Sequence, residues 1–303
     1  MGIVANSAVI GSITTLIVGI FIFLWIKKGK SKSKKRLLMD SNVKYQVPLL
    51  GKENINWNTR RFRFGLPTED SVLGVGPGEH IYLSAKINGD LVIRPYSPIT
   101  GDETKGYFDL IIKVYFANQN PKYPNGGKMS QYLESMKIGE TIDIRGPDGR
   151  AIYIGNGDFL IKKKKTDPLV KYHYDKLGMI AGGTGLTPLF AVLREIISNP
   201  EDKTQVSFLF ANHTSDDILL REELDQIASR FPDQVKIHYT LGKSEEGWQH
   251  KVGRVDDNMI RDCLFPPADD TMIMMCGPPA MVKETLQPTL DKMGYSELRR
   301  HVF

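Results

Sequence analysis

The segment "LGMIAGGTGLTP" (residues 177–188) determines how the second half of this chain is read. Its first five residues are apolar or small and predict a short buried strand. Gly182, Gly183 and Gly185 then let the backbone turn tightly and approach a ligand closely. Pro188 suits the first turn of a helix, where no backbone donor is lost. The amide groups and the dipole at such a helix start favour a phosphate.

This glycine-rich turn is not the complete G-x-G-x-x-G pattern, because Pro188 stands in place of the third glycine. An ordinary strand-to-helix turn therefore stays open on this segment alone. The sequence after this turn predicts further strands and helices in alternation. Strands are expected at 205–211, 235–241 and 272–276, and helices at 186–199, at 219–231 and from near Pro279. The alternation predicts a parallel sheet covered by helices on both faces.

Residues 46 to about 155 are strand-like throughout. "HIYLSAKI" and "LVIRPYS" flank Asn88-Gly89-Asp90, which is a strong hairpin signal. Further strands are expected at 107–115, 141–147 and 151–154, with one short helix starting near Lys128. Many short strands separated by turn residues predict a small antiparallel β-barrel ahead of the α/β domain.

The N-terminus predicts a membrane anchor. Residues 1–26 carry no charged side chain, and residues 8–26 form an apolar stretch just long enough to cross a bilayer as a helix. A cleavable signal peptide is the alternative, but its basic segment should precede the apolar stretch, and here it follows in the tether 27–45. The positive cluster predicts a body in the cytosol. Myristoylation of Gly2 is disfavoured because Asn6 stands where the motif requires Ser or Thr.

Charge and composition exclude several classes of protein. The formal charge is +5, but seven cations between Lys27 and Arg36 supply +7, so the rest of the chain carries −2 and a general nucleic-acid binder is excluded. The two cysteines, Cys263 and Cys276, are too few for a disulfide framework. The six histidines show no metal-ligand spacing, so no metal site is expected.

Three short motifs carry polar groups that a hydrophobic core does not need. In "RPYSPIT" (94–100), Arg94 can bind a phosphate, Tyr96 can lie against an aromatic ring or bond a ribose, and Ser97 can bond a ring nitrogen. In "GGKMSQYLE" (126–134), the helix start at Lys128 can hold a second phosphate, although a simple cap by Ser130 is the alternative.

The third motif is "MCGPPAM" (275–281). Cys276 ends a strand that should be central in the parallel sheet, and ligands bind at such strand ends. A buried structural cysteine is the alternative reading. A nucleophilic role is disfavoured, because no histidine lies close in the sequence to activate the thiol.

Taken in order, "RPYSPIT", "GGKMSQYLESM", "GMIAGGTGLTP", "FLFAN" and "MCGPP" resemble the NADH-cytochrome b5 reductases of the ferredoxin-reductase-like superfamily, over roughly residues 50–303. The resemblance implies an FAD-binding barrel at 46–160, a linker at 161–176 and an NAD(P)H-binding domain at 177–303. The motifs and the resemblance together predict cofactor contacts at Arg94, Pro95, Tyr96, Ser97, Ile111, Lys113, Phe116, Gly127, Lys128, Met129, Ser130, Gly182, Gly183, Thr184, Gly185, Thr187, Pro188, Gly242, Lys243, Arg254, Cys276, Gly277 and Pro278.

Within that set, Ser97 and Cys276 are the expected catalytic residues. Thr187 is expected near the flavin, and Thr184 and Cys276 near the nicotinamide coenzyme. Phe303 matches an aromatic chain end of the superfamily and is expected either near the site or in an ordinary terminal strand.

The implied activity is hydride transfer from NADH to FAD, followed by single-electron transfer to cytochrome b5. An acidic haem protein would dock on a set of lysines: Lys128, Lys162, Lys163, Lys164 and Lys165. The implied location is the endoplasmic reticulum, the mitochondrial outer membrane or both. Two alternatives stay open: the same chemistry with another haem protein or a quinone as acceptor, and a flavin-free, membrane-tethered interaction protein.

The residues expected at the coenzyme site differ from those typical of the family. These reductases typically carry an acid after "YTL", whereas this chain has Gly242 followed by Lys243, and Arg254 stands where an aromatic residue is frequent. We therefore expect NADH as the donor, with unusually good use of NADPH. The alternative is that these differences are neutral changes in an exposed loop, and that Glu245 or Glu246 binds the ribose in place of the missing acid.

Overall fold

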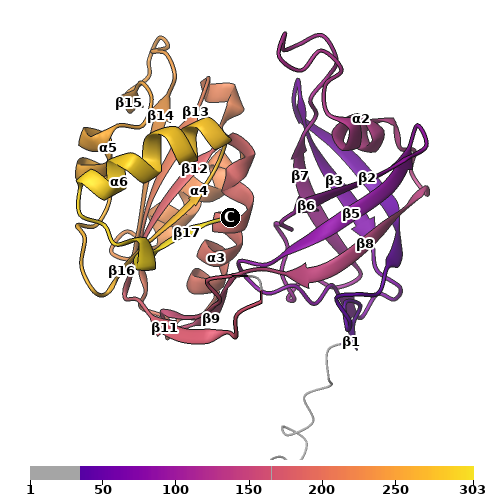
Figure 1. The fold of residues 1–303 in the computed structure, drawn as a ribbon, viewed down its shortest axis with the longest axis horizontal. Helices are drawn as coiled ribbons and strands as arrows, with labels where there is room; N and C mark the ends of the chain where they lie inside the picture. Colours follow the sequence, from indigo (N-terminus) through magenta and orange to yellow (C-terminus); the bar gives the residue numbers. More distant parts are fainter. Residues whose placement is uncertain (1–34, 165) are drawn as a thin grey trace, which may run out of the picture. The chain divides into compact units, whose positions relative to one another are not determined.

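The computed structural model describes residues 35–164 and 166–303, and residues 36–303 form one compact unit. The predicted membrane anchor, residues 8–26, lies outside the described residues. Within the described ranges, no helix has the length and apolar character needed to cross a membrane. An antiparallel domain is followed along the chain by a parallel α/β domain, as the sequence predicts (Figure 1).

The first domain is built on a six-stranded sheet in the order β6-β5-β8-β2-β3-β7, with every neighbouring pair antiparallel. Its strands are β2 (Tyr45–Asn56), β3 (Thr59–Gly65), β5 (His80–Ile87), β6 (Asp90–Tyr96), β7 (Tyr107–Lys113) and β8 (Thr141–Asp148). Two short strands, β1 (Lys35–Arg36) and β4 (Ser71–Val72), lie outside this sheet. The sheet curves around its core, and helix α2 (Lys128–Ser135) covers one end of it (Figure 1).

The predicted β5–β6 hairpin is confirmed. Ile87 pairs with Asp90, and the two residues between them, Asn88 and Gly89, have φ angles of 52° and 89°. Two successive positive φ angles make the tight turn whose twist matches that of the flanking strands. The turn sets the register of β6 and so places Arg94 opposite Leu83.

The next three strands form a small sheet of their own in the order β11-β10-β9: β9 (Ala151–Gly155), β10 (Asp158–Ile161) and β11 (Val170–His173). Strand β11 lies inside the predicted linker 161–176, so much of that segment is paired rather than a plain connection. The buried hydroxyl of Tyr153 accepts a hydrogen bond from the Gly157 amide at 2.9 Å and donates to the carboxylate of Asp202. This contact fixes the small sheet to the loop that follows α3.

The second domain has a six-stranded sheet in the order β15-β14-β13-β12-β16-β17, in which every neighbouring pair is parallel. Its strands are β12 (Lys176–Gly182), β13 (Gln205–Asn212), β14 (Val235–Leu241), β15 (Lys251–Val252), β16 (Thr271–Cys276) and β17 (Arg300–Val302). Its helices are α3 (Leu186–Ser198), α4 (Arg221–Arg230), α5 (Asp257–Cys263), the π-helix η3 (Ala280–Leu286) and α6 (Gln287–Lys292), with short 3-10 turns η1 (Gly183–Gly185), η2 (Ser215–Asp217) and η4 (Glu297–Arg299).

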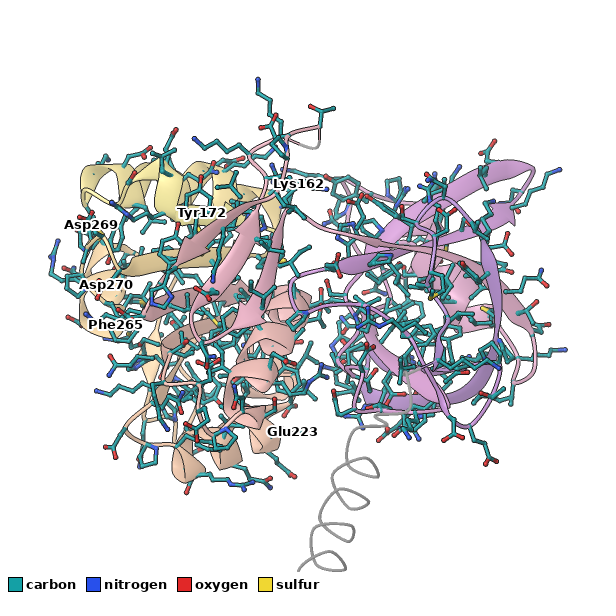
Figure 2. The ribbon with its side chains drawn as sticks, turned by 90° about the horizontal axis from the view of Figure 1, so that it is seen from below. Lys162, Tyr172, Glu223, Phe265, Asp269 and Asp270 are labelled. Carbon is teal, nitrogen blue, oxygen red and sulfur yellow. The ribbon has the colours of Figure 1, made fainter. Side chains whose placement is uncertain are left out.

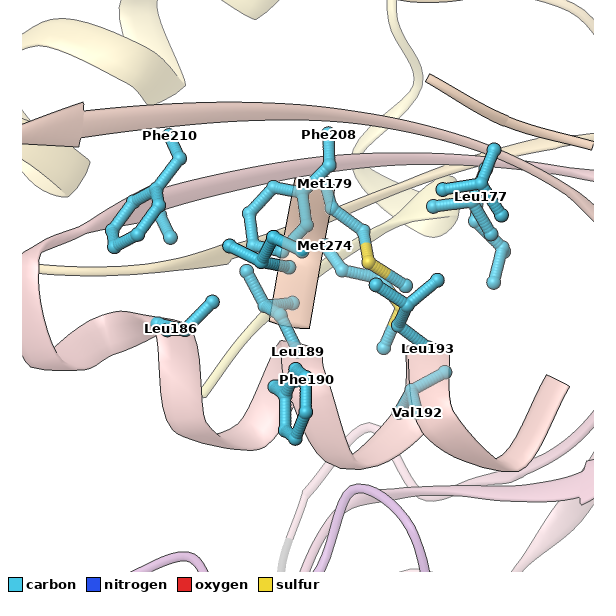
Figure 3. Close-up of a cluster of buried hydrophobic side chains, with 14 of the residues drawn as sticks. Leu177, Met179, Leu186, Leu189, Phe190, Val192, Leu193, Phe208, Phe210 and Met274 are labelled. Atoms are coloured by element: carbon cyan, nitrogen blue, oxygen red, sulfur yellow. The ribbon is translucent and has the colours of Figure 1, made fainter. Parts of the chain in front are cut away.

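Side chains alternate between two buried faces of this sheet. Leu177 and Met179 of β12 pack on the side of α3, whereas Ile180 packs on the side of α5 and α6. Figure 3 shows the first face, with Leu189 and Leu193 of α3 directed at the strands. Both faces are dry, which explains why these strands are continuously apolar in the sequence.

The order of the strands creates a switch point. The chain runs outward from β12 through β13 and β14 to β15, and then returns to the other side of β12 to form β16. A crevice opens in such sheets outside the carboxyl ends of the two strands where the direction reverses. Here those ends are Gly182 and Cys276.

Helix α3 also holds the first domain. The Arg194 side chain donates to the carbonyl oxygen of Ile99 and lies 3.5 Å from the Glu103 carboxylate. Ile99 and Ile111 of the first domain pack into the same apolar cluster as α3. The helix that begins at the switch point is therefore attached to the segment that follows Ser97.

Candidate functional site

A cavity of about 1770 Å³ lies between the two domains and is lined by residues of both. Sites for drug-sized molecules usually occupy ~300–1,000 Å³, so this one has room for a larger ligand or for two ligands. All but one of the predicted cofactor residues line it. The exception is Phe116, which is half-buried in the loop after β7; the neighbouring Tyr115 lines the cavity instead.

The end of β6 supplies the polar groups of "RPYSPIT". Arg94 is exposed, and its Nη1 donates to the Ile93 carbonyl at 2.7 Å, while its other donors have no partner among the described residues. Burial raises the pKa of Tyr96 to about 12, so its hydroxyl remains a neutral donor at pH 7. Ser97 is half-buried beside it. The strand end thus presents one cation and two neutral hydroxyls to the cavity.

Helix α2 presents an open N-terminus to the same cavity. No side chain caps it, and the N-cap residue is Gly127. The Ser130 hydroxyl accepts a hydrogen bond from the Tyr115 amide and donates one to the Gly127 carbonyl, each at 3.1 Å, so it braces the loop and does not cap the helix. Lys128 is exposed and forms an ion pair with Asp90 at 2.9 Å. The uncapped amides of this turn form a suitable place for a phosphate.

The two strand ends of the switch point are in direct contact. A Cβ atom at Gly185 would lie only 2.1 Å from the carbonyl oxygen of Cys276, so no larger residue fits there. Gly183 has a φ angle of 53° and faces open space. Helix α3 begins immediately after, with no side-chain cap and no acid in its first turn. The arrangement leaves a positive helix end directed at the cavity wall.

Cys276 ends β16 on this wall and is half-buried. Burial raises the pKa of its thiol to about 11, so the thiol is protonated at pH 7 and is a poor nucleophile. This agrees with the sequence, which offers no activating histidine. Cys276 therefore contributes to the shape of the cavity wall and adds no charge to it.

The chain terminus reaches the cavity, which the sequence alone left undecided. Strand β17 pairs with β16, the Phe303 amide donates to Met275 at 3.0 Å, and Phe303 lines the cavity. The His301 ring lies 4.6 Å from the Phe303 ring, and burial lowers the pKa of His301 to about 4. This histidine is therefore neutral at pH 7.

Sequence reasoning missed several other lining residues, among them His80, Tyr82, Asp148, Arg150, Asn212 and His301. They come from strands and turns that are distant in the chain, and no local pattern marks most of them, although Asn212 ends the "FLFAN" motif. Asn212 is informative, because both polar atoms of its side-chain amide are buried without a hydrogen-bond partner in the described part of the chain. A buried amide of this kind is costly unless a ligand or water satisfies it.

Comparisons with known proteins agree with this geometry. Residues 46–153 match the oxidoreductase FAD-binding domain, and residues 179–287 match the oxidoreductase NAD-binding domain. The chain is 54% identical over 267 residues to NADH-cytochrome b5 reductase 2 of Gallus gallus, which covers 88% of each chain. It is 45% identical to NADH-cytochrome b5 reductase 1 of Homo sapiens, with full coverage of both chains (100% each).

Among solved structures, the chain is similar to the cytochrome b5 reductase domain of Ulva prolifera nitrate reductase. The TM-score is 0.82 at 38% identity, and the alignment covers 88% of this chain and 99% of that one.

The contact between the two strand ends generates a prediction. Gly185→Ala places a methyl group against the Cys276 carbonyl, so we expect it to lower the free energy of unfolding by about 1–3 kcal/mol. Urea denaturation measures the change. Gly51→Ala is the control, because a Cβ there meets nothing closer than 3.7 Å, and its effect should stay within about 0.5 kcal/mol. An unchanged transition midpoint in Gly185→Ala would show that the strand ends separate without cost.

Proposed function

The chain belongs to the NADH-cytochrome b5 reductase family, and on that premise we propose that it passes electrons from NADH through bound FAD to cytochrome b5. The observation that carries the proposal is the single cavity that joins the motif of the FAD-binding domain to the switch point of the NAD-binding domain. Electron transfer between a flavin and a nicotinamide requires the two rings to be held together, and this cavity is bounded by the residues expected to hold each of them.

The residues present fit both nucleotides. The uncapped start of α2 and the unpaired donors of Arg94 suit the phosphates of FAD. The glycine turn at 182–185 and the uncapped start of α3 suit the phosphates of the coenzyme. The unsatisfied amide of Asn212 offers both a donor and an acceptor on the coenzyme side of the cavity.

When bound, FAD accepts a hydride as an electron pair and releases the two electrons singly, a chemistry that no side chain here supplies. The chain's own groups set the surroundings in which this happens. Tyr96 is protonated at pH 7, with its pKa raised to about 12 by burial, and its hydroxyl can donate a hydrogen bond. The Cys276 thiol and the His301 ring are neutral at pH 7, so neither adds charge to the cavity. Ser97 brings a hydroxyl that can hold a proton beside Tyr96.

The proposal is tested on the purified full chain. We expect a yellow protein whose flavin absorbance is bleached by NADH without oxygen and restored when oxidised cytochrome b5 is added. A colourless protein, or a flavin that NADH leaves oxidised, would contradict the proposed function.

Arg94→Ala should weaken FAD binding by about 1.5–3 kcal/mol, because a charge-assisted contact to a phosphate is lost. The melting temperature should fall with it, since a bound ligand stabilises the fold by mass action. Titration of apoprotein with FAD gives the affinity. Lys86→Ala is the control: Lys86 is exposed on the same hairpin and does not line the cavity. Full flavin content with an unchanged melting temperature would remove Arg94 from the FAD site.

We propose further that cytochrome b5 docks on the lysines at 128 and 162–165. Lys163 and Lys164 are exposed, which supports a role in attracting an acidic partner. Lys162 is mostly buried and lies 3.8 Å from the Asp148 carboxylate, and Figure 2 shows it where the two domains meet. Lys128 is partly neutralised by Asp90, and Lys165 lies outside the described residues. Lys163 and Lys164 are therefore the pair to test.

Changing Lys163 and Lys164 together to Ser should raise the KM for cytochrome b5 by about tenfold at low salt, because electrostatic steering acts on the association rate. Reduction of ferricyanide, a small acceptor, should hardly change. The control is the pair Lys203→Ser and Lys236→Ser, which removes the same charge from other exposed sites. Equal effects on both acceptors would argue against docking at these lysines.

We also propose that residues 8–26 anchor the enzyme in the endoplasmic reticulum, the mitochondrial outer membrane or both, with the body in the cytosol. The support is the uncharged segment followed by a basic cluster. Deletion of residues 1–34 should give a soluble enzyme that reduces ferricyanide at the full-length rate. The deletion ends there because Leu37 and Leu38 donate backbone hydrogen bonds to Val72 and Leu73. A truncated protein that folds but is inactive would show that the N-terminus does more than tether.

A further inference from the structure

Two unpaired cations line the cavity beside a glycine at one edge of the parallel sheet. Gly242 directly follows β14 and Lys243 comes next, while Arg254 lies two residues after β15. Because β14 and β15 are parallel neighbours, their carboxyl ends meet at the same edge. Lys243 and Arg254 are both exposed, and neither has a hydrogen-bond or ion-pair partner within residues 35–164 and 166–303. Their charge is therefore available to a ligand.

Two acids near this edge already accept hydrogen bonds from neighbouring groups. The carboxylate of Glu245 accepts hydrogen bonds from the Ser215 amide at 3.1 and 3.3 Å. Asp217 lines the cavity, but its carboxylate accepts from the Thr214 hydroxyl at 2.9 Å. Neither Glu245 nor the exposed Glu246 lines the cavity. The alternative in which Glu245 or Glu246 binds the ribose therefore gains no support.

The glycine itself is not required by the backbone. Gly242 has no positive φ angle, and a Cβ atom there would meet nothing closer than the His213 carbonyl oxygen at 3.7 Å. A side chain would fit without strain. The effect of glycine at this position is thus to leave room in the cavity beside the two cations and the unsatisfied amide of Asn212.

The same edge of a nucleotide-binding sheet usually decides between the two nicotinamide coenzymes. A carboxylate there binds the ribose 2′-hydroxyl and repels a 2′-phosphate, whereas a nearby arginine accommodates the phosphate. Arginine binds phosphate oxygens through a planar fork, and lysine adds a point charge. Here Gly242 occupies the position of the carboxylate and has no side chain. A lysine and an arginine, Lys243 and Arg254, line the cavity next to it.

We propose, on the basis of the proposed function, that Lys243 and Arg254 form a phosphomonoester site for the 2′-phosphate of NADPH, so that the enzyme uses both coenzymes. The site acts on binding alone. The hydride chemistry would be the same as with NADH: NADP⁺ would be released once the hydride and one solvent proton had passed to the flavin.

Adenosine 2′,5′-bisphosphate and 5′-AMP test the site without catalysis, since they differ only in the 2′-phosphate. Calorimetric titration of the full-length holoenzyme should show the bisphosphate binding about tenfold more tightly than AMP. Arg254→Gln and Lys243→Gln should each weaken the bisphosphate by about tenfold and change AMP by less than about twofold. Gly242→Asp should reverse the preference, because it restores a repelling carboxylate.

Lys236→Gln is the matched control. Lys236 is exposed at the opposite end of β14 and does not line the cavity, so the same loss of charge should change neither affinity. If Lys236→Gln weakened the bisphosphate as much as Arg254→Gln did, the effect would come from net charge, and the assigned site would be wrong.

Steady-state kinetics give a second measurement. The ratio of the kcat/KM for NADH to that for NADPH should lie far below a thousandfold, and Gly242→Asp should raise it. A wild-type ratio above about a thousandfold, or ~4 kcal/mol, overturns the proposal. If AMP binds and NADH reduces the flavin but the bisphosphate binds no better than AMP, the inference alone fails. If neither nucleotide binds and NADH leaves the flavin oxidised, the proposed function fails first.

Discussion

The close approach of Gly185 to the Cys276 carbonyl is the contact on which the rest of the site depends. A side chain at that position would need space that the backbone of β16 already fills, at 2.1 Å from the position of a Cβ atom. The contact holds the carboxyl ends of β12 and β16 together, and α3 starts from the same turn. The uncapped start of α3 and the cavity wall at Cys276 therefore meet at a position that only glycine can occupy.

The two domains are joined by polar contacts made by α3 and by the loop that follows it. Arg194 binds the chain just after the "RPYSPIT" motif, and Tyr153 binds Asp202 in the loop after α3. Both contacts are substantially buried, so breaking either would leave polar groups without partners. Helix α3 therefore sets the spacing between the flavin side and the coenzyme side of the cavity.

The cavity is lined by both neutral and positively charged groups. Three of the lining groups, Tyr96, Cys276 and His301, are neutral at pH 7. Cations also line the cavity, with Arg94 near the end of β6 and with Lys243 and Arg254 at the edge of the parallel sheet. Neutral groups suit the rings of a nucleotide, and the cations suit its phosphates. The same logic explains why an extra phosphate on the ribose can be accepted at the sheet edge.

The sequence by itself determined the order of most elements and the residues of each local motif, because hydrophobic periodicity and glycine-rich turns are properties of neighbouring residues. The β5–β6 hairpin, the start of α2 at Lys128 and the strand–turn–helix at 177–198 were all predictable. The short strands β11 and β15 and helix α5 were not, since few residues carry each signal. Only the tertiary structure decided that Tyr115 and not Phe116 lines the cavity, that Asp148 takes up Lys162, and that His301 and Phe303 reach the site. These facts depend on strands that meet from distant parts of the chain, and burial there lowers the pKa of His301 to about 4 and so removes its charge.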